Sequence, residues 1–240
     1  NVSGIVRNPL LNNQLFVAVS GKVFTSTDGG NNWTTAYSGI QGDVNCLVAI
    51  DSMVMAASQY GLFFTNNKGV SWSRNTYFAD SVEITAMIAK GKDLYIGTIN
   101  HGIYYSGNKG VDWSHVHVGL PADAYVNSFC FHGNELYAGT FSGIFRSTDG
   151  SNWTEANNGL PFFNMVFALT SHNNIIFAAI MNEVYFTTDN GDTWKVVESA
   201  WPQSTVVSAL ATDGSTLFAG TGESVYTSAD NGTTWNKNKT

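Results

Sequence analysis

The sequence has few charged side chains and few cations. Charged residues make up 12% of the 240 residues, and eighteen Asp and Glu outnumber eleven Lys and Arg, which gives a formal net charge of −7. A nucleic-acid-binding protein needs a basic face, so this balance argues against nucleic acid as a partner. Low charge together with 13% aromatic residues also argues against a disordered chain.

Long apolar runs, helical periodicity and an N-terminal leader are missing as well. Because no run of about 18 apolar residues occurs, we expect no membrane span. No stretch has a convincing helical period, which favours an all-β chain. The sequence opens at Asn1 without Met or an apolar leader, so we expect a processed or excised chain whose targeting signal is not visible.

A tryptophan recurs about every 40 residues, and the segments around it repeat too. Six of the seven tryptophans form this series at spacings of 39 to 41 residues, and only Trp201 lies outside it. Short aromatic and β-branched segments bounded by turn residues accompany each copy, which is typical of strands. Four such strands fit into each repeat, as in a β-propeller blade.

The repeats therefore predict an all-β fold, a six-bladed β-propeller with four antiparallel strands per blade. Each blade should be formed by the consecutive strands of one repeat. We expect a single domain over residues 1–240, with blades at approximately residues 1–40, 41–80, 81–121, 122–161, 162–202 and 203–240.

A turn sequence precedes each repeating tryptophan. Its full form, Ser/Thr-x-Asp-x-Gly-x-x-Trp, occurs at residues 26–33, 187–194 and 228–235. The Asp can accept hydrogen bonds from backbone N–H groups of its own turn, and the Gly can supply a positive φ. We also expect each Trp ring to pack between neighbouring sheets.

This turn resembles the Asp-box, or BNR repeat, of sialidase-like β-propellers. The resemblance implies turns between the third and fourth strands, on the face opposite the active site, with a structural role. Calcium binding by the Asp residues is the alternative, and Asn67 and Asn108 at the Asp position of two copies weaken it. We therefore expect no metal and no cofactor. The predicted structural residues are Asp28, Trp33, Asp149, Trp153, Asp189, Trp194, Asp230 and Trp235.

The residues of a sialidase-like active site are not in place. By the resemblance, such a site needs three converging arginines, a Tyr–Glu pair and an Asp, whereas this chain has only Arg7, Arg74 and Arg146, at positions that cannot easily converge. A glycosidase needs two carboxylates about 5–10 Å apart. The candidate carboxylates share no recurring motif, so we predict no catalytic residue. These candidates are Asp80, Glu83, Asp123, Glu183 and Glu223.

Nucleophile and metal signals are thin. Cys46 and Cys130 lie in the first strands of non-adjacent blades, so we expect two buried free thiols instead of a disulfide. His115 and His117 alternate so as to share one strand face, which leaves open either a two-His metal site or a solvated edge strand.

Loops at one end of the predicted blades are rich in aromatic residues. Rings supply contact area and neighbouring polar groups fix orientation, which suits a peptide or a sugar. The alternative is that an aromatic residue covers a junction between blades. Trp201 is the strongest candidate because it breaks the Trp period beside Pro202. The predicted binding residues are Trp201, Tyr77, Phe78, Tyr125, Phe162, Phe163, Tyr60 and His101.

These observations predict a secreted, non-enzymatic interaction or scaffold module that binds a protein or glycan partner, inside a larger extracellular assembly. The low Lys and Arg content suits an extracellular chain. A lectin with several equivalent pockets is the alternative, but such a lectin should repeat its ligand residues, and the loops differ from blade to blade. A glycoside hydrolase is the least favoured alternative.

Overall fold

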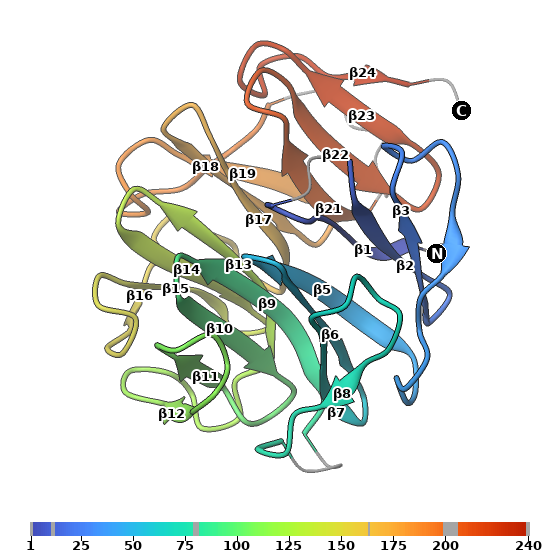
Figure 1. Cartoon of the computed structure of the whole chain (residues 1–240). Helices are drawn as coiled ribbons and strands as arrows, with labels where there is room; N and C mark the ends of the chain where they lie inside the picture. Colours follow the sequence, from blue (N-terminus) through green and yellow to red (C-terminus); the bar gives the residue numbers. More distant parts are fainter. Residues whose placement is uncertain (1, 11–12, 79–81, 163, 199–205, 239–240) are drawn as a thin grey trace. The chain divides into compact units, whose positions relative to one another are not determined.

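The computed structural model describes residues 2–10, 13–78, 82–162, 164–198 and 206–238. These residues form six four-stranded antiparallel sheets, and the fold is a six-bladed β-propeller, which confirms the predicted fold class (Figure 1). No helix within the described ranges is long and apolar enough to cross a membrane. The chain divides into two compact units, Asn1–Val116 and His117–Thr240, and each unit contains three of the sheets.

The first unit contains blades one to three. Its strands are β1 (Val2–Arg7), β2 (Leu15–Val19), β3 (Lys22–Ser26), β4 (Thr34–Thr35), β5 (Val44–Ile50), β6 (Met53–Ser58), β7 (Gly61–Thr65), β8 (Ser73–Arg74), β9 (Ile84–Lys90), β10 (Asp93–Thr98), β11 (Ile103–Ser106) and β12 (Ser114–Val116).

The second unit contains blades four to six. Its strands are β13 (Val126–His132), β14 (Glu135–Thr140), β15 (Gly143–Ser147), β16 (Thr154–Glu155), β17 (Val166–His172), β18 (Ile175–Ile180), β19 (Glu183–Thr187), β20 (Lys195–Val196), β21 (Val207–Thr212), β22 (Leu217–Thr221), β23 (Val225–Ser228) and β24 (Asn236–Lys237).

Every sheet is formed by four consecutive strands paired in sequence order, as the repeats predict. Because all pairs are antiparallel, the connections after the first and third strands lie at one end of a blade, here called the turn end. The connections after the second and fourth strands lie at the opposite end, the loop end. The Trp-containing turns are at the turn end, and the predicted binding loops are at the loop end.

The core of each unit lies between neighbouring sheets. In the first unit, Phe16 of β2 meets Trp72 of the next blade edge-to-face, with ring centroids 6.3 Å apart. The second strand of a blade that is covered on both sides is buried almost throughout, as in β6 and β18. Burial on both faces explains why these strands are continuous apolar runs without polar alternation.

Polar side chains near the start of the first strands connect adjacent blades. The Asn45 amide donates to the carbonyl of Ile84 at 3.1 Å, and the Asn127 amide donates to the carbonyl of Val166 at 2.9 Å. In both cases donor and acceptor are 39 residues apart, which is one repeat. The repeat therefore positions hydrogen bonds between sheets as well as strands within them.

A second link between blades depends on glycine. The backbone N–H of Trp194 donates to the carbonyl of Asn158 at 2.9 Å, directly before Gly159. Gly159 has φ +90, and a Cβ there would stand 2.2 Å from the Trp194 carbonyl oxygen. The same arrangement joins Gly39 to Trp72 and Gly119 to Trp153. Only glycine allows this backbone approach.

Both cysteines are free thiols in first strands. Cys130 is buried, and Cys46 is half-buried. Burial raises the pKa of both thiols to about 12, so neither is a thiolate near neutral pH.

Candidate binding site at the loop end of the blades

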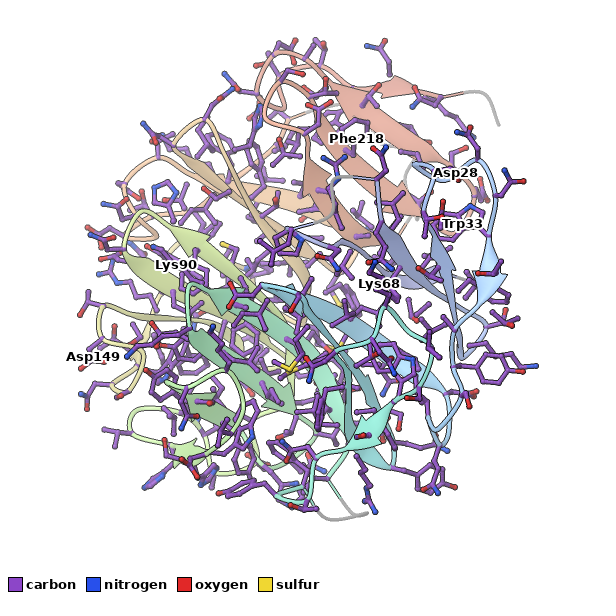
Figure 2. The ribbon with its side chains drawn as sticks, viewed as in Figure 1. Asp28, Trp33, Lys68, Lys90, Asp149 and Phe218 are labelled. Carbon is purple, nitrogen blue, oxygen red and sulfur yellow. The ribbon has the colours of Figure 1, made fainter. Side chains whose placement is uncertain are left out.

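The Trp-containing turns, here called the repeat turns, are held together by one carboxylate each. In the turn after β3, the Asp28 carboxylate accepts hydrogen bonds from the Ser26 hydroxyl at 2.8 Å and the Asn32 backbone N–H at 2.9 Å. These bonds, the one from the Asn32 N–H above all, lower the pKa of Asp28 to about 2. Figure 2 shows Asp28 and Trp33 together on this turn.

The other repeat turns reproduce this pattern. Asp189 and Asp230 accept bonds from the turn in the same way, and their pKa values are also lowered to about 2. In the shortened turn, bonds from Asn152 and Ser151 lower the pKa of Asp149. Asn67 supplies the same acceptor oxygen without a charge. The carboxylates are thus used inside the turns.

The repeat tryptophans differ in their surroundings. Trp72 and Trp194 are buried, and their indole N–H groups donate across the blade junction to the carbonyls of Ala36 and Ala156. Trp153 is also buried, and Trp235 is half-buried. Trp33 departs from the expected packing, because it is 38% exposed, and its indole donates to Gly30 of its own turn, as the buried Trp113 does to Gly110.

At the loop end of the first unit, three ring side chains form a continuous cluster, here called the Tyr77 cluster: Tyr77, Tyr104 and His115. The Tyr77 and Tyr104 rings are 6.2 Å apart, and the Tyr104 and His115 rings are 4.9 Å apart. His115 Nε2 donates to the carbonyl of His101 at 2.7 Å. Tyr77 is 49% exposed, so the cluster presents a ring surface to solvent.

Phe78 is a core residue, which corrects its prediction as a binding residue. It is 2% exposed and packs edge-to-face against Tyr104 and Trp113, with ring centroids 5.2 and 5.0 Å away. Phe78 thus supports the cluster from below while its neighbour Tyr77 stays in solvent.

Two members of the Tyr77 cluster are absent from the predicted set. Tyr104 and His115 are direct partners across the β11–β12 pair, so their side chains share one face of the sheet. Burial raises the pKa of Tyr104, and the electrostatic influence of Tyr77 raises it to a smaller extent. The alternation of β11 was the signal that could have placed Tyr104 beside the predicted residues.

Tyr60 lies at the same loop end of blade two as Tyr77, in the connection between β6 and β7. It is exposed, and its carbonyl accepts a hydrogen bond from the Arg74 guanidinium at 2.8 Å. Its ring packs on Gly42, where an added Cβ would stand 2.5 Å from Tyr60 Cδ2. The ring is therefore held in place while part of it faces solvent.

The second unit also presents aromatic residues at its loop end. Tyr125 stacks on exposed Phe141 with ring centroids 4.1 Å apart, and Phe141 N–H donates to the Tyr125 carbonyl at 3.1 Å. Phe162 is 93% exposed. The predicted residues Trp201 and Phe163 lie outside the described residues.

Two of the three arginines, Arg74 and Arg146, bond to groups of their own unit. Arg74 donates to Tyr60, as described, and Arg146 pairs with Asp192 at the turn end at 2.8 Å. The Glu183 carboxylate accepts the Tyr185 hydroxyl at 2.6 Å, and burial with this bond raises the pKa of Tyr185 to about 12. Within the described ranges, no three His, Cys, Asp or Glu side chains gather in a way that could hold a metal ion.

The sequence model of the DUF6242 beta propeller domain matches residues 98–217, which is half of the 240 residues. The chain belongs to this family. No curated protein sequence matches this chain significantly.

Three solved structures illustrate which proteins this chain is similar to. The GH74 xyloglucanase from Xanthomonas campestris is 15% identical with a TM-score of 0.79, over 98% of this chain and 46% of that one. YCF48 bound to D1 peptide is 16% identical with a TM-score of 0.78, over 99% and 82%. The extracellular domain of BT4673 from B. thetaiotaomicron is 16% identical with a TM-score of 0.82, over 100% and 33%.

These similarities concern the fold. The chain spans about half the length of the xyloglucanase that it matches. At identities of 15–16%, a shared propeller fold does not show which residues of this chain bind a ligand or catalyse a reaction.

Proposed function

We propose that this chain is a non-enzymatic interaction module that binds a protein partner through aromatic residues at the loop ends of its blades, with the Tyr77 cluster of the first unit and Phe162 of the second as separate candidate surfaces. The observation that carries the proposal is the exposure of large rings there, led by Phe162 and Tyr77. Single exposed apolar residues are ordinary, but Tyr77 belongs to a continuous ring cluster, and such surfaces are typical of interfaces. Tyr60 and Phe141 add further exposed rings.

A protein partner is favoured over a glycan because the loop end does not repeat. The Tyr77 cluster combines two Tyr with one His, whereas the second unit presents a Tyr125–Phe141 stack and a separate Phe162. A lectin that gains avidity from equivalent sites would repeat its ligand residues. YCF48, a propeller of similar fold, has been solved with a bound peptide.

The engagement of Arg74 and Arg146 supports a non-enzymatic role. Arg74 and Arg146 bond to groups of their own unit, and Arg146 lies at the turn end, away from the aromatic loops. Tyr185 carries a raised pKa of about 12, which opposes ionisation of its hydroxyl.

We further propose that the module acts outside the cell, within a larger assembly, and that its repeat turns are Asp-boxes with a structural role. The low Lys and Arg content supports the location. The turn geometry supports the assignment, since each Asp bonds to its own turn.

The experiment compares ligand classes on one protein. The purified chain is screened against a phage-displayed random peptide library, a glycan array and soluble xyloglucan, beside a Tyr77→Ser/Phe162→Ser double variant. Val70→Ser, a change of an exposed side chain at the turn end, is the matched control. We expect peptides that bind the wild type and the control, with affinity for the double variant reduced about tenfold or more.

Three outcomes would contradict the proposal. Binding to glycans alone would make the chain a lectin. Cleavage of xyloglucan would make it an enzyme. Peptide binding that the double variant retains would place the partner site elsewhere on the protein.

A further inference from the structure

At the junction between blades four and five, an arginine fills the space between the third strand of blade four and the repeat turn of blade five. Arg146 of β15 reaches across to the turn of blade five. Its guanidinium donates to the carbonyl of Asn190 at 2.7 Å and pairs with the Asp192 carboxylate at 2.8 Å. This junction shows which groups a repeat turn offers to an arginine.

In blades five and six the equivalent space is open. Phe186 occupies in β19 the position that Arg146 occupies in β15, the fourth residue of the third strand. Phe186 does not fill the space that an arginine would, and a cavity of about 840 Å³ remains. The cavity, here called the Phe186 groove, is lined by Ile175, Phe186, Val196, Glu198, Asp230 and Asn231.

The repeat turn at this groove has the backbone conformation of the turn that holds Arg146. Asn231 has φ 55 and Asn190 has φ 58, and the glycines that follow have φ 81 and 84. The carbonyl of Asn231 is therefore the counterpart of the Asn190 carbonyl. Among the residues that the structure describes, none donates a hydrogen bond to it.

The charge of the groove and of its unit favours a cation. Glu198 and Asp230 line the groove against one cation, Lys195. Residues 117–240 carry eleven Asp and Glu but only four Lys and Arg, so this unit attracts positively charged partners. The Phe186 ring adds an apolar wall on which a planar guanidinium can stack.

We propose that the Phe186 groove binds an arginine side chain presented by a partner protein. The aliphatic stem packs on Ile175 and Phe186, and the guanidinium donates to the Asn231 carbonyl and the Glu198 carboxylate. The Asn231 carbonyl plays the part that the Asn190 carbonyl plays for Arg146, whereas the carboxylate differs, because Thr233 stands where Asp192 stands and Glu198 supplies the negative charge instead. The groove is at the turn end, so it is a second site that does not depend on the aromatic loops.

A similar groove in the first unit explains the specificity and supplies a control. Phe64 occupies the equivalent position in β7, and the cavity beside it has a volume of about 530 Å³. Here Lys109 stands at the position of Asn231 and pairs with Asp51, and Arg74 also lines the cavity. Two cations against one carboxylate disfavour an incoming arginine.

The test is a titration of the ¹⁵N-labelled full chain, followed by NMR, with acetyl-Gly-Arg-Gly-amide. The control peptide contains citrulline, which has nearly the same shape without the charge. We expect saturable shifts of the Gly232, Val196 and Val197 amides, with a dissociation constant in about the millimolar range. The citrulline peptide should bind at least about fivefold more weakly.

Phe186→Arg should close the groove from within. Blade four carries arginine at this position, so the variant should fold, and we expect it to lose saturable binding. Phe64→Arg, the same change at the equivalent position of the first unit, should leave the affinity unchanged. Glu198→Gln should weaken binding about threefold and provides a second reading if Phe186→Arg does not fold.

The proposal is overturned if the citrulline peptide binds as tightly, if no saturable shift occurs at these amides, or if the Glu198→Gln and Phe186→Arg proteins keep the wild-type affinity. These results leave the loop-end proposal untouched, because its variants and ligands are different.

Discussion

Gly159 provides the sharpest test of how the blades are held together. In Gly159→Ala, the new methyl group would stand 2.2 Å from the Trp194 carbonyl oxygen, which is backbone and cannot rotate away. The backbone must shift, which weakens the 2.9 Å bond from Trp194 N–H to the Asn158 carbonyl. The positive φ of +90 adds a cost for any residue with a Cβ.

The two costs can be separated by magnitude. Placing alanine at a positive φ costs about 1–2 kcal/mol. A broken and unsatisfied backbone bond costs about 1–3 kcal/mol more. Gly159→Ala should therefore lower the free energy of unfolding by about 2–5 kcal/mol. Gly214→Ala is the matched control, because Gly214 has φ +93 and no heavy atom within 4 Å of an added Cβ, so only the first cost applies.

Urea unfolding of the two variants and the wild type, followed by both tryptophan fluorescence and circular dichroism, measures these differences. Equal destabilisation by Gly159→Ala and Gly214→Ala would refute the contact with Trp194 as a determinant of stability.

Three further predictions concern the turns, the links between blades and the thiols. Because the pKa of Asp189 is lowered from 3.8 to about 2, its ionised form stabilises the fold above pH 4, and that contribution is lost as the pH falls toward 2. Asp189→Asn should therefore make the free energy of unfolding fall less steeply with decreasing pH than in the wild type. An unchanged acid limb of the stability-versus-pH curve would contradict this. Asn127→Ala removes the bond to the Val166 carbonyl and should cost about 1–2 kcal/mol in urea unfolding, whereas a cost near zero would mean that the bond is dispensable. Cys46 and Cys130 should react with a thiol reagent at pH 8 only after unfolding, so fast labelling of the folded protein would refute their raised pKa values.

The repeats made the architecture predictable from sequence. The spacing of the tryptophans and the turn residues set the number of blades and the order of strands, and the structure has both. The links between blades were less visible. Gly39, Gly119 and Gly159 follow the fourth strands of blades one, three and four at the same position, but only the structure shows that each meets the tryptophan backbone of the next blade.

The loop end was predictable as a region and less so residue by residue. Tyr77 and Phe78 are adjacent aromatics in a segment without periodicity, so no pattern could tell the exposed ring from the buried one. Tyr104 and His115 belong to strands, and their place beside Tyr77 depends on the pairing of β11 with β12. These positions depend on packing between strands and loops that are far apart in the sequence, so no local sequence pattern predicts them.

The most direct test of the central claim is the affinity of a selected peptide for single-site variants. Isothermal titration with the wild type, Tyr77→Ser, Phe162→Ser and the turn-end control Val70→Ser gives four dissociation constants. We predict that at least one loop-end variant weakens binding about tenfold or more while the control matches the wild type. Equal constants for all four proteins would contradict the claim that the aromatic loops form the binding surface.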